Sequence, residues 1–373
     1  MTVVHVFPSF GIGGAQMRAV QLANWFGARQ RHVVISIDND YGSRTFLHPE
    51  IEIASISPPF EKGAALRHLP TIRRILAAHG AELLLTYNWG SIEWALANRL
   101  SPVVPRHIHF EDGFGPEEVD RQIPRRVWFR RLALSGRQSK IVVPSQTLRE
   151  IATGIWRFSD RRVFYVPNGI DLGRFRAVGA TAPAPGFVKQ PGEIVIGTVA
   201  RLRPEKNLRR MISAFATLQK ATAQSCRLLI VGDGSERVLL EEHARNLGLQ
   251  ERVVFFGATE RPEALLAAMD IFTLSSDTEQ MPISVLEAMA CGLAVASPDV
   301  GDVANMVAAE NAQLVRGVRS AEGLATALRT LCEDTALRAR LGTANRAKAE
   351  QEFDENVMLA RYEQLFAAPS TAS

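Results

Sequence analysis

The chain alternates short apolar runs, rich in β-branched residues, with longer segments whose apolar residues recur at helical spacing. This alternation is typical of parallel strands joined by helices that cover both faces of a sheet. In the first half, strands are predicted at residues 3–7, 33–37, 51–56, 83–86, 107–110, 141–143 and 163–166. Helices are predicted between them at residues 15–28, 66–78, 92–100 and 146–155. The fold class is therefore α/β, with doubly wound, Rossmann-like sheets.

A second series of strands follows a segment that resembles a connector. Residues 177–190 read AVGATAPAPGFVKQ, a small-residue stretch rich in Pro and Gly, and the later strands are predicted at 194–199, 228–231, 253–256, 271–274 and 294–296. A chain of 373 residues is also too long for one ordinary core. We therefore predict an N-terminal domain at 1–180, a C-terminal domain at 181–350 and a final helix at 351–373 that returns to the first domain through Phe353, Val357, Tyr362 and Phe366.

Composition narrows the class of protein. The chain is 46% hydrophobic and 22% charged, as in ordinary globular domains, and it begins without the basic and apolar regions of a secretory signal. No eighteen apolar residues run together, so a membrane-spanning helix is not expected. The widely spaced Cys226, Cys291 and Cys332 fit reduced core residues and neither a disulfide framework nor a zinc site. We expect a cytoplasmic enzyme.

Positive charge is concentrated in one segment. The formal net charge is +4, yet residues 121–140 hold six Arg, one Lys and no acid, so the rest of the chain is net negative. Such a local patch argues against nucleic-acid binding over the whole surface. Four arginines share a predicted amphipathic helix with Trp128, namely Arg125, Arg126, Arg130 and Arg131. The helix suits peripheral attachment to an anionic membrane surface, and an ordinary solvated helix or a grip on an anionic acceptor are the alternatives.

A glycine loop follows the first predicted strand. Gly11, Gly13 and Gly14 lie where the backbone can approach a ligand and leave amides free for an anion. A plain tight turn gives the same pattern, and the spacing is not that of the dinucleotide fingerprint.

Two further segments carry charge at strand ends. After the strand at 194–199, Arg201 and Lys206 flank the start of a helix and form a candidate diphosphate clamp, with a solvated loop as the alternative. The segment EQMPISVLE places the carboxylates of Glu279 and Glu287 across a loop-to-helix junction, where Pro282 suits the first helical turn. Carboxylates are good partners for vicinal hydroxyls, and the free amides of Ile283 and Ser284 can bind phosphate oxygens.

These motifs occur in order over nearly the whole chain and resemble the family 4 type of retaining glycosyltransferase, which has two facing Rossmann-like domains (GT-B) with a donor cleft between them. The matching segments are the glycine loop, VPNGIDLGRF at 166–175, VARLRPEKN at 199–207, IVGDG at 230–234 and EQMPISVLEAMACG at 279–292. The resemblance implies that Arg201 and Lys206 neutralise the donor diphosphate, Glu287 holds the ribose hydroxyls and Glu279 reaches the transferred sugar.

The resemblance extends the site to further residues. It places the nucleobase near Gly257, the diphosphate or sugar near Gly13 and Gly14, and the donor against Met281, Pro282, Ile283 and Ser284. It implies a histidine near the reacting sugar, for which His109 is the best match and His107 the second, with Glu111 and Asp112 beside them. Gln16 stands where many relatives carry Glu, and 301–305 reads GDVAN in place of the usual double glycine followed by Glu. These departures leave the acceptor contacts open.

The function expected from this resemblance is a retaining hexosyltransferase that uses a nucleoside-diphosphate sugar, with UDP or GDP, and a glycan or lipid-linked acceptor in cell-surface polysaccharide or glycolipid assembly. Arg201 and Lys206 would offset the leaving-group charge, so no metal and no cofactor are expected. The alternatives are a nucleotide-sugar epimerase or hydrolase on the same fold, a noncatalytic nucleotide-sugar-binding scaffold, and a dinucleotide oxidoreductase, which lacks its glycine spacing here.

Overall fold

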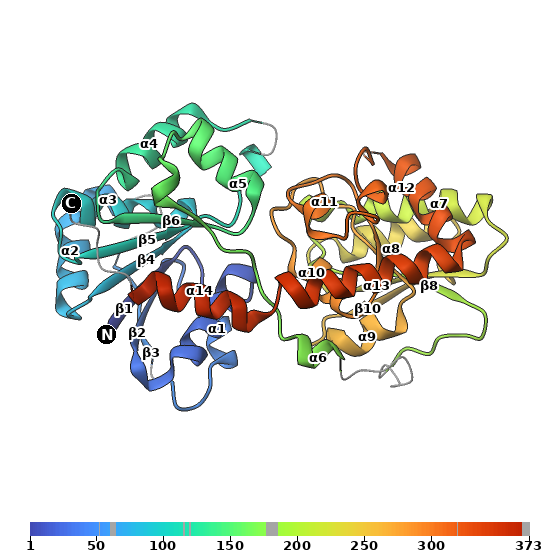
Figure 1. Cartoon of the computed structure of the whole chain (residues 1–373), viewed down its shortest axis with the longest axis horizontal. Helices are drawn as coiled ribbons and strands as arrows, with labels where there is room; N and C mark the ends of the chain where they lie inside the picture. Colours follow the sequence, from blue (N-terminus) through green and yellow to red (C-terminus); the bar gives the residue numbers. More distant parts are fainter. Residues whose placement is uncertain are drawn as a thin grey trace. The chain divides into compact units, whose positions relative to one another are not determined.

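The computed structural model describes residues 1–51, 53–59, 65–114, 116–118, 121–176, 186–318 and 320–367. Two compact units divide the chain, one formed by residues 1–167 and 358–373 and the other by residues 168–357. Each unit is an α/β domain built on its own parallel sheet (Figure 1). The predicted fold class is confirmed.

The first unit contains a seven-stranded sheet of strand order β3-β2-β1-β4-β5-β6-β7, in which every neighbouring pair is parallel. The strands are β1 (Thr2–Phe7), β2 (Arg31–Ser36), β3 (Ile53–Ile56), β4 (Leu83–Tyr87), β5 (Arg106–Phe110), β6 (Ser139–Val143) and β7 (Val163–Tyr165). The strand order reverses between β1 and β4, and ligands of open α/β sheets bind beyond the carboxyl ends of the strands at such a switch point.

Alternate residues of each strand bury against opposite layers of helices. Val3 and Phe7 pack with α1 (Gly14–Phe26) and the final helix α14 (Glu355–Ala367), whereas Val4 and Val6 pack with α2 (Leu69–Ala78) and α3 (Ile92–Leu100). The remaining helices of this unit are α4 (Pro124–Leu134) and α5 (Gln146–Glu150), the latter continued by a π-helical turn at Ile151–Ile155. The predicted helix 66–78 becomes α-helical only from Leu69, because a 3₁₀ turn at Ala65–His68 precedes it.

The second unit contains a five-stranded parallel sheet of order β10-β9-β8-β11-β12, which reverses between β8 and β11. Its strands are β8 (Ile194–Val199), β9 (Cys226–Val231), β10 (Val253–Gly257), β11 (Ile271–Thr273) and β12 (Ala294–Ala296). Its helices are α6 (Leu172–Arg176), α7 (Leu208–Ala221), α8 (Arg237–Asn246), α9 (Pro262–Ala268), α10 (Ile283–Ala290), α11 (Val303–Met306), α12 (Ala321–Glu333) and α13 (Thr335–Glu352). Cys226 and Cys332 are buried thiols, and Cys291 is half-buried and also free.

The two units divide before the connector that the sequence indicated. Residues 168–176 belong to the second unit because Ile170, Leu172 and Phe175 are buried in its core, and Ile170 exchanges backbone hydrogen bonds with the segment 353–355. The predicted boundary at 180 and 181 lies outside the described residues.

The last helix joins the first unit, with Tyr362 and Phe366 in the core beside β1 and α1 (Figure 1). Of the other two predicted anchors, Phe353 lies in the core of the second unit and Val357 is 40% exposed.

Candidate functional site

The switch point of the second unit carries a loop with two functional cations, Arg201 and Lys206. Arg201 follows β8 directly and is exposed, and its guanidinium forms no hydrogen bond or ion pair with any residue that the structure describes. Lys206 lies at the end of the same loop, where its Nζ is 2.6 Å from Oε1 of Glu279. Glu279 belongs to the loop after β11, the strand that pairs with β8. The loops of the two switch-point strands are therefore joined by a charged pair.

Hydrogen bonds hold this loop in a fixed conformation. Asn207 has a left-handed backbone (φ 42°), and its side-chain oxygen accepts from the amide of Arg210 and caps α7. Ser275 donates its hydroxyl to the carbonyl of Lys206 at 2.9 Å, and the amide of Asp277 donates to the carbonyl of Glu205 at 3.0 Å. The backbone of Glu205 and Lys206 is thus anchored to the loop that follows β11.

Glu279 is held by its neighbours in the same way. Its Oε1 accepts from the hydroxyl of Ser276 at 2.7 Å as well as from Lys206, and its side chain is only 10% exposed. Gly301 packs against the backbone of this loop, where an added Cβ would lie 2.4 Å from the carbonyl oxygen of Glu279 at a φ of 54°. Although 301–305 departs from the usual pattern, it keeps a glycine, Gly301, at a position where a side chain could not fit.

The amino end of α10 provides backbone donors. The helix begins at Ile283, with Pro282 as its N-cap and not in its first turn, and no side chain caps it. The amides of Ile283 and Ser284 therefore lack intrahelical acceptors. Met281, just before the helix, is buried and accepts hydrogen bonds from Asn168 at its carbonyl oxygen (3.1 Å) and its sulfur (3.2 Å). The VPNG segment thus supports this helix end.

Glu287 lies one turn into α10 and is half-buried. Its carboxylate accepts no hydrogen bond from the part of the chain that the structure describes. Burial raises the pKa of Glu287 to about 7. The positive charge of Arg174 lowers this pKa, and the negative charge of Glu263 raises it, but burial has the largest effect. A carboxylate with unfilled acceptor sites is a good partner for hydroxyl groups. At the end of β10, Gly257 (φ 95°) accepts a hydrogen bond from the amide of Gly232 at 2.8 Å, on the same edge of the sheet.

In the first unit, the glycine loop leads into a helix without a side-chain cap. Gly13 is the N-cap of α1 and Gly14 its first residue. Gln16 donates its side-chain amide to the carbonyl of Ser9 at 2.8 Å, so it braces the loop that precedes the helix. The uncapped amides of this helix end face the same edge of the sheet as the ends of β4 and β5.

His109 and Glu111 stand at the end of β5 and are both completely buried. Nδ1 of His109 is 2.9 Å from the hydroxyl of Thr86, and that hydroxyl is 2.8 Å from Nε2 of His107. His107 continues to the hydroxyl of Ser139 at 2.9 Å. Burial, followed by the neighbouring His109 and the positive charge of Arg162, lowers the pKa of His107 to about 3, so this ring is neutral.

Arg130 lies inside the first unit, which corrects the prediction that four arginines of α4 share one exposed face. Its side chain is 0% exposed, and its Nε donates to Glu111 at 3.0 Å. Arg126 is 17% exposed and pairs with Glu117 and Glu118. Only Arg125 and Arg131 remain exposed, with Trp128 63% exposed between them. This eleven-residue helix packs against its domain with one side buried, and the spacing of the four arginines places Arg126 and Arg130 on that side.

Asp112 is also paired. Its carboxylate lies 2.6 Å from the guanidinium of Arg18, a buried residue of α1, and its amide donates to the side chain of Asn88 at 2.7 Å. Arg18, Thr86 and Asn88, and the interior position of Arg130, were not predicted from the sequence. The available signal was an arginine on the apolar face of a predicted helix and a threonine within the apolar run LLLTY.

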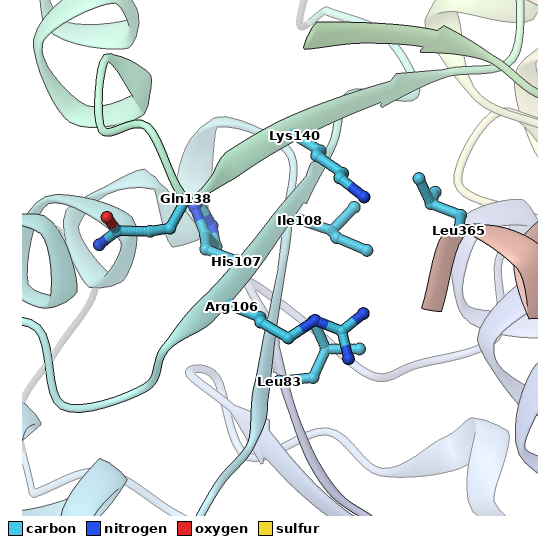
Figure 2. Close-up of a pocket in the computed structure, with 7 residues that line it drawn as sticks. All are labelled: Leu83, Arg106, His107, Ile108, Gln138, Lys140 and Leu365. Atoms are coloured by element: carbon cyan, nitrogen blue, oxygen red, sulfur yellow. The ribbon is translucent and has the colours of Figure 1, made fainter. Parts of the chain in front are cut away.

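A small hollow lies near the amino ends of β4, β5 and β6. Figure 2 shows its lining residues, which are Leu83, Arg106, His107, Ile108, Gln138, Lys140 and Leu365. It lies at the opposite end of the strands from His109 and Glu111, and ligands of open sheets bind at the carboxyl ends. Within the described ranges, no group of three or more His, Cys, Asp or Glu side chains is placed to hold a metal ion. No described helix has the length and apolarity needed to cross a membrane.

Known proteins resemble each half of the chain. Residues 185–348 match the family model of the glycosyl transferases group 1, and residues 12–174 match that of glycosyltransferase family 4. One relative is the D-inositol 3-phosphate glycosyltransferase of Nocardia farcinica, 30% identical over 282 residues, which are 70% of this chain and 61% of the relative. Another is the N-acetyl-alpha-D-glucosaminyl L-malate synthase of Bacillus anthracis, 24% identical over 61% of this chain and 55% of the relative. The chain thus spans little more than half the length of these curated relatives.

Solved structures share the fold over nearly the full length. Anabaena HepE in complex with UDP covers 98% of this chain and 100% of its own, with a TM-score of 0.76 and 19% identity. WaaG, a glycosyltransferase involved in lipopolysaccharide biosynthesis, covers 99% of this chain and 100% of its own, with a TM-score of 0.75 and 18% identity. These neighbours are GT-B glycosyltransferases with two Rossmann-like domains. Since the two family models together match most of the chain, it belongs to the family 4 glycosyltransferases.

Proposed function

We propose that the protein is a retaining, metal-independent glycosyltransferase that moves a hexosyl group from a nucleoside-diphosphate sugar to a glycan or lipid-linked acceptor in cell-surface polysaccharide or glycolipid assembly. The observation that carries the proposal is the switch point of the second unit, which brings together a guanidinium and a carboxylate without partners among the described residues and a helix end without a side-chain cap from them. These are the groups that a diphosphate and a ribose require.

The donor diphosphate is bound by Arg201, Lys206 and the amides of Ile283 and Ser284. Arg201 has no partner among the described residues, so binding an anion breaks no existing ion pair of this side chain. Glu287 accepts from the ribose hydroxyls, and the edge near Gly257 borders the base. UDP is the preferred diphosphate of the proposal, because HepE is solved with UDP and with UDP-glucose. GDP is the alternative.

Transfer follows from the same charges. The bond between the sugar C1 and the diphosphate breaks, and the electron pair stays on the phosphate oxygen, where Arg201 and Lys206 offset the charge. The acceptor oxygen attacks C1 from the same face from which the leaving group departs. The proton of the acceptor hydroxyl passes to the departing phosphate. Glu279, held by Lys206 and Ser276, binds hydroxyls of the transferred sugar. The acceptor oxygen attacks C1 directly, so the scheme uses no protein nucleophile, and the diphosphate serves as the base that accepts the proton.

The first unit is proposed to supply the acceptor side, through the uncapped end of α1 and the loops after β4 and β5. Relatives differ in the acceptors that their names give, from L-malate to inositol 3-phosphate and monoglucosyldiacylglycerol synthesis. We further propose that the protein attaches to the anionic inner face of the cell membrane through Arg125, Arg131 and the exposed indole of Trp128.

Melting temperature in excess chelator tests the donor site. UDP, GDP, ADP and NAD are each added to the full chain, and a ligand at a hundredfold its dissociation constant stabilises by about 2.7 kcal/mol. We expect stabilisation by UDP, lost in Glu287→Ala and Arg201→Ala. No shift with any diphosphate, or a shift with NAD alone, would overturn the proposal. Incubation with UDP-sugars with and without acceptor then separates transfer from hydrolysis or epimerisation, and NMR of the product's anomeric proton reports retention.

A further inference from the structure

A line of buried polar side chains crosses the first unit from β6 to α4. It runs from Ser139 through His107, Thr86 and His109 to Glu111, and then to Arg130. The contact between Nε2 of His109 and Oε2 of Glu111 is 3.6 Å, and the others are within hydrogen-bond distance. All six residues are buried. Such a chain is unusual in a core, because buried polar groups are costly unless each has a defined partner.

The direction of the protons in this line depends on one charge. The hydroxyl of Thr86 has one proton, so it donates to one of its two histidines and accepts from the other. If Glu111 is ionised, Nε2 of His109 must carry a proton toward it, and Nδ1 of His109 then accepts from Thr86. If Glu111 is neutral, its own proton can bind Nε2, and the order along the line reverses. The charge of Glu111 therefore selects the tautomer of His109.

Arg130 is placed to fix that charge. Burial alone raises the pKa of Glu111, but the positive charge of Arg130, with His109 beside the carboxylate, holds the pKa below its usual value. The guanidinium carbon lies 5.0 Å from the ring centre of Trp89 and 4.9 Å from that of Trp156, which exclude water from the pair.

On its far side, Arg130 lies 3.4 Å from each carboxylate oxygen of Glu118. Glu118 also accepts from Arg126 at 3.0 Å and from the amide of Ile123 at 3.1 Å. Helix α4 is thereby connected through two carboxylates to the end of β5.

We propose that Arg130 is a positioning residue that keeps Glu111 ionised, so that Glu111 fixes His109 with its proton on Nε2 at the carboxyl end of β5. The inference rests on the proposed function in placing the acceptor at this edge of the first unit. Nε2 of His109 and Oε1 of Glu111 have no hydrogen-bond partner among the described residues although both are buried. At 3.6 Å from Oε2 of Glu111, the Nε2 proton of His109 is oriented by the charge of the carboxylate and not by a short hydrogen bond.

A purely structural ion pair would hold α4 in place without controlling His109, and the experiment has to separate the two. Arg130→Met alone leaves a buried carboxylate uncompensated and can unfold the first unit. The informative variant is therefore the double change Arg130→Met with Glu111→Gln, which removes both charges. Arg130→Lys keeps the positive charge, and Arg131→Met changes the neighbouring exposed arginine as a matched control.

The first readout is the tautomer of His109 in the full chain labelled with ¹⁵N-histidine, from the two-bond nitrogen–proton correlations of its ring, assigned by loss of its signals in His109→Gln. We expect a proton on Nε2 in the wild type, Arg130→Lys and Arg131→Met, and a changed or mixed tautomer in the double variant. A wild-type ring protonated on Nδ1, or an unchanged tautomer in a folded double variant, would overturn the proposal.

The second readout is transfer activity. The double variant should lose about 100-fold in kcat, as expected when a reacting group is misplaced, with the donor KM and the UDP-induced melting shift unchanged. Arg130→Lys should recover most of this loss. An unchanged kcat with an altered tautomer would also contradict the positioning role. Absence of a UDP shift in the wild type would instead contradict the proposed function, while the tautomer would still be read.

Discussion

The carboxyl ends of the two sheets carry similar residues in opposite states. At the end of β5, Glu111 is completely buried and paired with Arg130 of α4. In the second unit, Arg201 after β8 is exposed and Glu287 of α10 is half-buried, and neither side chain has a hydrogen-bond partner among the described residues. A charged side chain that is paired within the protein holds other groups in position, whereas one with free hydrogen-bonding sites can bind a ligand. Under the proposed function, Glu111 and Arg130 would shape the acceptor side and Arg201 and Glu287 would bind the donor, although all of them looked alike as motifs.

The largest expected effect is on stability in the first unit. Arg130→Met should destabilise the protein by about 3–5 kcal/mol, because it leaves a carboxylate buried without its partner. Arg125→Met, on the exposed face of the same helix, should change stability by less than about 0.5 kcal/mol. Urea unfolding followed by tryptophan fluorescence, with Trp89 and Trp156 beside Arg130, measures both. Equal effects of the two variants would show that the interior pair does not behave as a buried charge pair.

Arg201→Ala should have the next largest effect, on UDP binding and catalysis but not on the stability of the ligand-free protein. Loss of one charge-stabilising donor costs about 100- to 1,000-fold in kcat, while the melting temperature without ligand stays at the wild-type value because Arg201 has no described partner to lose. Arg203→Ala is the matched control, since it removes an exposed arginine two residues along the same loop. A similar kcat loss in Arg203→Ala would mean that the loop's general charge, and not the position of Arg201, binds the diphosphate.

The fold was largely predictable, because its strands and helices are encoded in local periodicity. All twelve predicted strands form, and their carboxyl ends carry the motifs at the switch points as the order of the motifs indicates. The partners of Arg130 were not predictable, because the face of a short helix that turns inward depends on Trp89, Glu118 and Trp156, which are distant in sequence. The exposure of Arg201 depends on its own loop and was easier to predict than the burial of Arg130, which depends on tertiary contacts.

Glu287 gives a smaller, pH-dependent effect that sharpens the contrast with Glu111. Since the pKa of Glu287 is raised to about 7 in the fold, the neutral form is favoured, and stability without ligand is lost as pH rises from about 4.5 through 7. Binding of UDP needs the ionised form as an acceptor, so its affinity should fall about tenfold between pH 8 and pH 6 beyond the titration of UDP itself.

Glu287→Gln supplies the control for that pH dependence. It keeps the size of the side chain and removes its titration, so calorimetry on this variant measures the part that belongs to UDP. The variant should also melt higher than the wild type at pH 8 without ligand, and equally at pH 5. An identical pH profile of UDP affinity in both proteins would exclude Glu287 as the titrating group.

The remaining prediction concerns the exposed face of α4, where Arg125 and Arg131, which the interior does not use, flank Trp128. Each basic residue near an anionic membrane contributes about 1 kcal/mol, so Arg125→Glu with Arg131→Glu should weaken binding to anionic vesicles more than tenfold and leave Arg130 and its partners intact. The reversal Arg73→Glu with Arg74→Glu, on exposed positions of α2, changes net charge equally and should have little effect. Sedimentation with phosphatidylglycerol vesicles measures the difference, and equal losses in both variants would assign any attraction to net charge, so that α4 would have only its interior function.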